Sequence, residues 1–142
     1  FNAQKKTYVY QIWMAAHPPV FERHFVLDVE GKAIDIEAMK VASRQFIGTH
    51  DFKGYSTDKT KKSTVRTIEK IAIITEGNFL KIEFTGDGFL YNMVRIIVGT
   101  LLEIGFGKRD ASTIETVFQS KNRERAGETA PAKGLILEDV YY

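Results

Sequence analysis

The chain has 142 residues, which is enough for one domain with a substantial hydrophobic core. Hydrophobic residues make up 44% and charged residues 27%, and the lack of cysteine excludes disulfides and thiolate metal sites. No apolar run reaches the length of a membrane span and no signal peptide is visible, so we expect a cytoplasmic protein with no membrane partner. The sequence has no initiator Met and opens directly into strand-like residues, which suggests a fragment or a trimmed chain.

The first third of the chain predicts strands and one helix. Residues 6–15 are rich in β-branched and aromatic side chains and predict a strand, which a Pro-Pro pair ends. Residues 25–29 indicate a short second strand or an extended approach to the next element. Residues 35–47 then follow a helical pattern, with Asp35 as the N-terminal cap and Gly48 at the expected stop.

The remainder predicts a hairpin, two helices and a last strand. A polar, Lys-rich loop is expected over residues 51–63, and the turn residues Glu76-Gly77 separate two strands. These strands are expected at residues 63–75 and 78–85. The later elements are a long helix, a short helix and a strand, expected at residues 89–104, 111–120 and 134–142.

This order of elements predicts the fold class. Two β-α-β units in the sequence β-α-β-β-α-β form the ferredoxin-like, or RRM-like, arrangement. We therefore expect an α+β domain with an antiparallel sheet and both long helices on one face. The other face would be open for RNA, a partner domain or a second subunit.

Positive charge is concentrated locally although the net charge is only +2. Between residues 53 and 70, two acidic residues, Asp58 and Glu69, stand against six basic ones, namely Lys53, Lys59, Lys61, Lys62, Arg66 and Lys70. Local basic patches matter more than net charge for binding phosphates. From composition alone, a solvated loop and a nucleic-acid contact are equally good interpretations.

The long helix carries a single charged residue, Arg95, between Gly88 and Leu102. At 100° per residue its core face comprises Leu90, Met93, Val94, Ile97, Leu101 and Ile104. Most of the other side is also apolar, so we expect both sides of the helix to be covered. An arginine there either lines a cleft and pairs with a carboxylate or phosphate, or extends along its aliphatic stem to solvent.

Two further residues, one before and one after Arg95 in the sequence, also have expected roles. Asp87, at the expected start of the helix, is interpreted as its N-cap. Gly99, one turn after Arg95, would let another chain segment approach closely.

The segment that contains Arg95 resembles a family signature. Residues 86–105, Gly-Asp-Gly-Phe-Leu-Tyr-Asn-Met-Val-Arg-Ile-Ile-Val-Gly-Thr-Leu-Leu-Glu-Ile-Gly, closely resemble that of the tRNA pseudouridine synthase A (TruA) family. Four further segments resemble family motifs in the same order, namely residues 1–3 with 6–10, 48–52, 64–68 and 129–137. The resemblance covers almost the whole chain.

The resemblance implies an RNA-modifying activity. Members of this family isomerise uridine to pseudouridine in the anticodon stem-loop of tRNA, near tRNA positions 38 to 40, and are usually homodimers. They use an aspartate for covalent catalysis, and the target base must leave the stack. They need no cofactor or metal, and here His17, His24 and His50 have no metal-ligand spacing.

Three residues of this sequence match family site residues. By resemblance, Tyr8 matches the tyrosine that stacks on the target base and is a candidate base. Arg95 matches the arginine that pairs with the catalytic aspartate, and Leu135 matches an apolar residue at the pocket floor. Read from the pattern alone, Tyr8, its strand neighbour Tyr10 and Leu135 could equally be core residues.

One family motif is not found in this sequence. The family nucleophile belongs to an Arg-Thr-Asp-x-Gly-Val-His motif in the N-terminal half. Thr57-Asp58 lacks both the preceding Arg and the following Gly-Val-His. We therefore expect residues 1–142 to be the C-terminal domain, with the N-terminal catalytic-Asp domain as its missing partner. Such a domain would hold part of the pocket and be inactive alone.

The resemblance also raises the expectation of RNA contacts, for which the candidates are Lys5, Lys6, Lys61, Lys62 and Arg66. The alternative function is a non-catalytic RNA-binding or dimerisation module with an RRM-like fold. Residues 79–84 do not fit the aromatic pattern of an RRM strand.

Overall fold

The computed structural model describes residues 5–60 and 62–141. In this part of the chain six strands form one sheet: β1 Lys5–Trp13, β2 Leu27–Asp28, β3 Gly48–Asp51, β4 Val65–Glu76, β5 Phe79–Gly86 and β6 Leu135–Tyr141. The strand order is β2-β1-β5-β4-β3, and β6 also pairs with β1. Its partners on β1 begin at Lys5 and end at Tyr10, whereas β2 pairs with Ile12 and Trp13. One edge of β1 is therefore shared by two strands.

The α+β, ferredoxin-like fold class is confirmed. Strands β6, β1, β5 and β4 are neighbours in that order and all pair antiparallel. The sheet as a whole is mixed rather than purely antiparallel, because the two residues of β2 run parallel to β1. The short strand considered at residues 25–29 is thus present, reduced to Leu27–Asp28.

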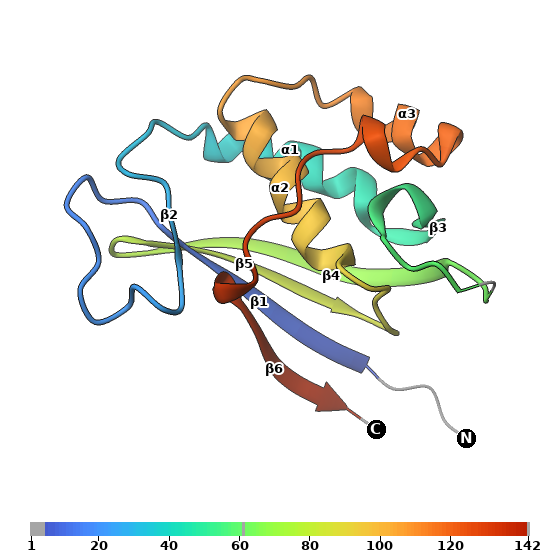
Figure 1. Ribbon diagram of the computed structural model, residues 1–142, viewed down its shortest axis with the longest axis horizontal. Coiled ribbons are helices and arrows are strands. Elements are labelled where there is room, and N and C mark those ends of the chain that lie inside the picture. Colours follow the sequence, from blue (N-terminus) through green and yellow to red (C-terminus); the bar gives the residue numbers. More distant parts are fainter. Residues whose placement is uncertain (1–4, 61, 142) are drawn as a thin grey trace.

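The helices cover one side of the sheet (Figure 1). They are α1 Ile36–Ser43, α2 Met93–Gly105 and α3 Thr113–Ser120, with 3-10 turns η1 Arg44–Phe46, η2 Lys53–Tyr55, η3 Arg123–Arg125 and η4 Ala132–Gly134. On strand β5 the alternate residues Leu80, Ile82 and Phe84 are completely buried. The core therefore lies between the sheet and the helices. No helix of the described residues is long and apolar enough to cross a membrane.

The first helix begins as the sequence predicts. Asp35 adopts extended backbone angles, and its Oδ1 accepts a 3.0 Å hydrogen bond from the Ala38 N–H, which is N-cap geometry. The regular helix ends at Ser43 and continues as η1 to Phe46. Gly48 follows with φ +104°, a conformation that side chains rarely adopt.

Two predictions near the other helices are wrong. The start of α2 is at Met93 rather than near residue 89, because Asn92 takes a left-handed conformation with φ +62°. Asp87 is not its cap: Asp87 Oδ1 accepts from the Thr67 N–H at 2.9 Å, and its own N–H donates to the Thr67 carbonyl at 3.1 Å. Asp87 therefore ties the end of β5 to β4.

The segment expected to be a loop, residues 51–63, includes the end of a strand and a 3-10 turn. Residue 51 ends β3, which pairs antiparallel with β4, and the turn η2 follows at once. A four-residue strand has too few residues to show an alternating pattern, so its pairing with β4 is visible only in three dimensions.

Helix α2 is covered on both sides, as its composition predicts. The six expected core residues are at most 6% exposed, and Ile96 and Leu102 on the other side are 0% and 5% exposed. The covering segment is residues 126–131. A Cβ on Gly99 would overlap the Glu128 carbonyl oxygen, so this crossing requires glycine.

The uncovered face of the sheet has a mixed charge. A shallow hollow of about 200 Å³ there is lined by Val9, Gln11, Ile74, Glu76, Lys81, Glu83, Ile136 and Glu138. Lys81 pairs with Glu76 at 2.7 Å, and Lys70 pairs with Glu83 at 3.7 Å. Carboxylates neutralise the lysines of this face, which makes it a poor phosphate-binding surface.

Candidate active-site pocket

A pocket of about 350 Å³ lies where β1, the start of α2 and the start of β6 meet. Its lining consists of Tyr8, Phe89, Leu90, Tyr91, Asn92, Met93, Val94, Arg95, Ala132 and Leu135. The structure therefore brings Tyr8, Arg95 and Leu135 together from three elements that are distant in the sequence. A positive charge, an aromatic ring and an aliphatic side chain share one cavity.

Arg95 is half-buried and held at two of its nitrogens. Its Nε donates to the Ala130 carbonyl at 2.7 Å, and its Nη1 donates to Asn92 Oδ1 at 3.0 Å. These contacts supply the partners that a lone arginine on a covered helix needs. They are neutral groups, and within residues 5–60 and 62–141 no Asp or Glu forms an ion pair with Arg95.

The third nitrogen of Arg95 is available to a ligand. Nη2 has no hydrogen-bond partner among the described residues, yet no buried side-chain nitrogen or oxygen there is unsatisfied. Nη2 is therefore accessible to solvent, and Arg95 forms part of the pocket wall. A guanidinium with a free nitrogen is suited to binding a carboxylate or a phosphate.

The covering segment, residues 126–131, holds Arg95 through the Ala130 carbonyl and is packed closely on α2. The Ala130 N–H donates to the Arg95 carbonyl at 3.0 Å, and the Gly127 N–H donates to Thr100 Oγ1 at 2.9 Å. A Cβ on Gly127 would lie 2.6 Å from the Thr100 Cα. The covering segment therefore contacts the helix through its own backbone, which fixes the Ala130 carbonyl relative to α2.

Tyr8 and Tyr10 lie on the same face of β1 but differ in environment. Tyr8 is half-buried in the pocket wall, and its ring meets Phe89 edge-to-face with 5.3 Å between the ring centroids. Tyr10 is fully buried, and its hydroxyl donates to the Pro131 carbonyl at 2.6 Å. Burial raises the pKa of Tyr10, and the charge of Arg95 offsets part of that rise. Tyr10 is a core residue, whereas Tyr8 is accessible to a ligand.

Leu135 begins β6 immediately after the turn η4. It is half-buried, packs against the core and lies opposite Tyr10 in the β1–β6 register. Its side chain contributes an apolar surface to the pocket beside Ala132.

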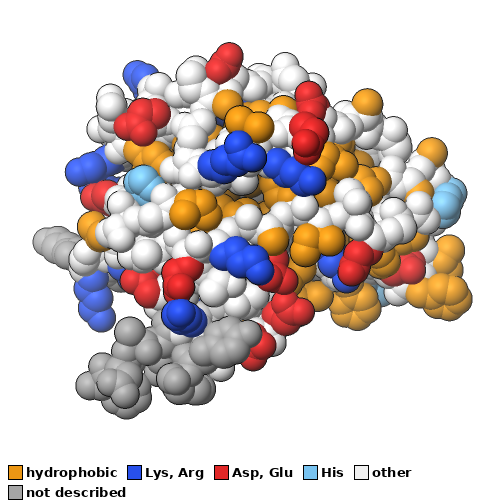
Figure 2. Space-filling view, turned by 180° about the vertical axis from the view of Figure 1, so that it is seen from behind, with side chains coloured by type: hydrophobic (Ala, Val, Ile, Leu, Met, Phe, Trp, Pro, Cys, Tyr) orange, Lys and Arg blue, Asp and Glu red, His pale blue; other side chains and the backbone are white. Residues whose placement is uncertain are grey.

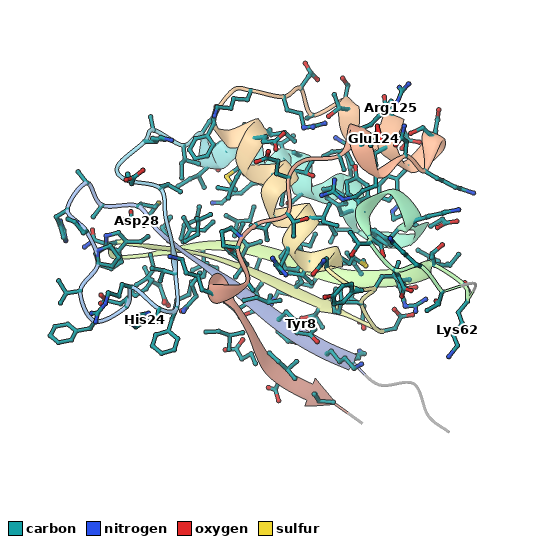
Figure 3. The ribbon with its side chains drawn as sticks, viewed as in Figure 1. Tyr8, His24, Asp28, Lys62, Glu124 and Arg125 are labelled. Atoms are coloured by element: carbon teal, nitrogen blue, oxygen red, sulfur yellow. The ribbon has the colours of Figure 1, made fainter. Side chains whose placement is uncertain are left out.

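The predicted basic contacts are spread unevenly around this site. Lys6 lies opposite Gly86, and Arg66 lies against Gly88, where its Nε would be 3.7 Å from an added Cβ. Lys62 is exposed on the loop before β4, at the end of the sheet where β1 starts (Figure 3). Lys6 and Arg66 therefore lie beside the loop that leads from β5 into the pocket.

Of the two remaining basic candidates, one is ion-paired and the other lies outside the described residues. Lys5 pairs with Glu69 at 3.1 Å, and Lys61 lies outside the described residues. Figure 2 shows basic and acidic side chains interspersed over the face it presents rather than one continuous basic patch. On that face, positive charge is therefore local.

The segment at residues 48–52 has a structural arrangement away from the pocket. His50 stacks on Phe118 with 4.6 Å between the rings, and its Nε2 lies 2.9 Å from the Ile47 carbonyl. Burial acts to raise the pKa of Asp51, but hydrogen bonds from Thr64 and the Lys53 N–H, together with the charge of Lys121, hold it below its usual value. Among the described residues, no three His, Asp or Glu side chains form a group that could hold a metal ion.

Two residues around Arg95 were not predicted from the sequence. Asn92 contacts Arg95 and also donates from Nδ2 to Thr57 Oγ1 at 3.0 Å. The only sequence signal for Asn92 is that asparagine tolerates a left-handed backbone. Ala130 acts through its carbonyl, so its side chain gives no signal.

Several known proteins are similar to this chain in sequence. The profile of a family described as tRNA pseudouridine synthase matches residues 42–142. The tRNA pseudouridine synthase A of Acetivibrio thermocellus is 46% identical over 143 residues, covering 100% of this chain and 58% of its own length. The tRNA pseudouridine synthase A 2 of Clostridium perfringens is 49% identical over 138 residues, covering 96% and 56%. The Bacillus subtilis tRNA pseudouridine synthase A is 42% identical over 143 residues, covering 100% and 58%. The chain therefore spans a little over half the length of these relatives.

Proposed function

This chain belongs to the tRNA pseudouridine synthase A family, and on that premise we propose that its parent protein isomerises uridine to pseudouridine in tRNA. The observation that carries the proposal is the pocket lined by Arg95, Tyr8 and Leu135, in which Arg95 keeps one nitrogen, Nη2, without a hydrogen bond to the described residues. The target is the anticodon stem-loop, near tRNA positions 38 to 40.

The role of the chain itself is that of a C-terminal domain. It contributes one wall of the active-site cleft, and a preceding domain of the same protein contributes the aspartate nucleophile. Arg95 binds that carboxylate through Nη2, and the opposite charge favours its ionised, nucleophilic form.

Tyr8 and Leu135 act on the substrate nucleotide. The flipped uracil stacks on the accessible ring of Tyr8, which Phe89 supports from its edge. Leu135 and Ala132 keep water from the sugar while the glycosidic bond is broken and the base is rejoined through carbon. The reaction needs no cofactor or metal.

The tRNA reaches the pocket over its basic surroundings. Lys6, Lys62 and Arg66 bind phosphates of the stem-loop, and Lys5 and Lys61 are further candidates for such contacts. The open face of the sheet, with its three glutamates, faces away from the RNA, which disfavours an RRM-like mode of binding. The protein acts as a homodimer in the cytoplasm, and the absence of cysteine from all 142 residues suits that reducing compartment.

A tritium-release assay on tRNA labelled at uridine C5 tests this function. The full-length protein should release tritium, and mass spectrometry should find pseudouridine in the anticodon stem-loop. Residues 1–142 alone should release none, because they lack the nucleophile. Turnover by the isolated chain would contradict the division of roles, and an inactive full-length protein would contradict the function.

A further inference from the structure

We propose that Asn92 is a positioning residue that orients the Arg95 guanidinium toward the pocket, and that Thr57 holds Asn92 in place. The proposal deepens the proposed function and rests on it, because it concerns how Arg95 is prepared to receive a carboxylate. It is supported by the backbone conformation of Asn92, by the hydrogen bonds of the Asn92 side chain, and by the second anchor of Arg95, which is the Ala130 carbonyl.

The backbone of Asn92 is unusual for its position. Its φ of +62° and ψ of 6° are left-handed, and within residues 5–60 and 62–141 only Glu30 and Lys121 share a positive φ among non-glycine residues. Such conformations cost free energy and persist where the surroundings fix them. At the start of a helix an Asn side chain usually caps a free backbone N–H. The Asn92 side chain makes no such bond to α2.

The side chain of Asn92 is used instead as a bridge. Arginine only donates hydrogen bonds, so the atom facing Arg95 Nη1 at 3.0 Å must be the amide oxygen. The amide nitrogen then donates to Thr57 Oγ1, also at 3.0 Å. Both ends of the amide are satisfied, and the left-handed backbone directs it between these two partners.

Two anchors determine where the guanidinium points. The Ala130 carbonyl holds Nε and Asn92 holds Nη1, which together fix the guanidinium plane and leave Nη2 without a bond in a residue that lines the pocket. Without the Asn92 contact, only the Nε bond remains, and the group can turn about it. A misdirected guanidinium still carries its charge but loses the geometry that a bidentate or end-on contact requires.

Thr57 connects this bridge to the Lys-rich loop. Its N–H donates to the Tyr91 carbonyl at 3.2 Å, and the neighbouring Ser56 hydroxyl donates to the same carbonyl at 3.4 Å. The chain at residues 56–57 is therefore fastened to residues 91–92 by backbone and side-chain contacts. The loop that carries Lys59 and Lys62 begins at this point, so the RNA-contacting loop and Arg95 share one support.

The test uses substitutions that keep the backbone conformation. Asn92→Gly removes the amide but accepts a left-handed φ without strain, so the protein should still fold, with the melting temperature lowered only by the loss of two hydrogen bonds. In the full-length protein we expect kcat on tRNA to fall on the order of 10- to 100-fold with KM nearly unchanged, since the binding surface remains. Glu30→Gly is the matched control, because Glu30 also has a positive φ (+56°) and lies in the turn after β2, away from the pocket.

Thr57 provides a second, graded test. Thr57→Val keeps the shape but removes the acceptor for Asn92 Nδ2, and should lower kcat in the same direction as Asn92→Gly. Thr57→Ser retains the hydroxyl and should keep the wild-type kcat.

Asn92→Asp places a carboxylate on Arg95, which would compete with the nucleophile, and should lower kcat at least as far as Asn92→Gly.

The outcomes separate this inference from the proposed function. Failure of the wild-type full-length protein to modify tRNA would overturn the function. A wild-type kcat in Asn92→Gly, or equal losses in Asn92→Gly and Glu30→Gly, would overturn the positioning role while leaving the function intact. An assay independent of activity is the Arg95 Nη1–H NMR signal, which should be sharp in the wild type and broadened in Asn92→Gly, because Nη1 loses its acceptor. An unchanged signal would also overturn the proposal.

Discussion

Arg95 and Ala130 hold each other through two reciprocal hydrogen bonds. The Arg95 Nε donates to the Ala130 carbonyl at 2.7 Å, and the Ala130 N–H donates to the Arg95 carbonyl at 3.0 Å. Among the described residues that line the pocket Arg95 alone is charged, and the pair links it to the segment that leads into β6. Because that segment also supplies Ala132 and Leu135, the charge and the apolar wall of the pocket depend on the same contact.

Arg95→Lys should abolish most activity while preserving the charge. Lysine has a single nitrogen and cannot bond both the Ala130 carbonyl and Asn92 while contacting a third group. In the full-length protein we expect kcat in the tritium-release assay to fall on the order of 100-fold or more. Arg125→Lys, at an exposed position of η3 (Figure 3), should change kcat little. Equal activity of the two variants would contradict the role of Arg95.

Gly99→Ala should destabilise the fold. An added Cβ would overlap the Glu128 carbonyl oxygen, so either α2 or the covering segment must shift. We expect the free energy of unfolding to fall by about 1–3 kcal/mol, measured by urea denaturation. Gly88→Ala is the matched control, because its nearest neighbour would be Arg66 Nε at 3.7 Å. A Gly99→Ala protein as stable as Gly88→Ala would show that the crossing is not tightly packed.

The buried tyrosines predict a loss of stability at alkaline pH. Burial raises the pKa of Tyr10, whose hydroxyl bonds to Pro131, and that of Tyr55, whose hydroxyl bonds to Ile114. The folded state then keeps protons that the unfolded state loses above about pH 10, so stability is full below that pH and falls as pH rises.

Tyrosine-to-phenylalanine variants isolate this effect. Tyr10→Phe should cost about 1 kcal/mol at neutral pH through its lost hydrogen bond. Above pH 10 its stability should fall less steeply than that of the wild type, by roughly 1.4 kcal/mol per pH unit for one proton. Tyr55→Phe should behave alike. Curves of stability against pH that run parallel for all three proteins would contradict the assignment.

Charge reversal at Lys62 should weaken tRNA binding. The residue is exposed on the loop that begins at Thr57, at the pocket end of the sheet. We expect Lys62→Glu to raise the Kd for tRNA at low salt, and Lys61→Glu/Lys62→Glu to raise it further, because each lost phosphate contact reduces counterion release. Lys32→Glu makes the same change of net charge in the loop after β2 and should have a smaller effect. Equal Kd values for Lys62→Glu and Lys32→Glu would favour a solvated loop without RNA contacts.

The parts of the fold that the sequence predicted are those with a repeating pattern. The alternation of Leu80, Ile82 and Phe84 identifies a strand with one buried face, and the apolar stripe of α2 identifies a covered helix. The features that were missed depend on tertiary contacts. Strand β3 exists through its pairing with β4, and Asp87 bonds to Thr67 rather than capping α2.

For the site, the sequence predicted the arginine but not its support. Arg95 is conspicuous as a lone charge on an apolar helix, and its need for partners follows from the cost of burial. The partners themselves, the Ala130 carbonyl and the Asn92 amide, become adjacent only when residues 126–131 cross α2. Tyr8 and Tyr10 share one face of β1, so only the position of the pocket distinguishes them.

The number of residues between Ala130 and Leu135 is constrained as firmly as their identities. Ala130 is fixed by Arg95 at one end, and Leu135 is fixed opposite Tyr10 in the β1–β6 register at the other. Because strand side chains alternate between faces, a one-residue insertion or deletion would turn Leu135 away from the pocket or break the contact with Arg95. Change in this connection can therefore proceed by substitution, while its length must stay the same.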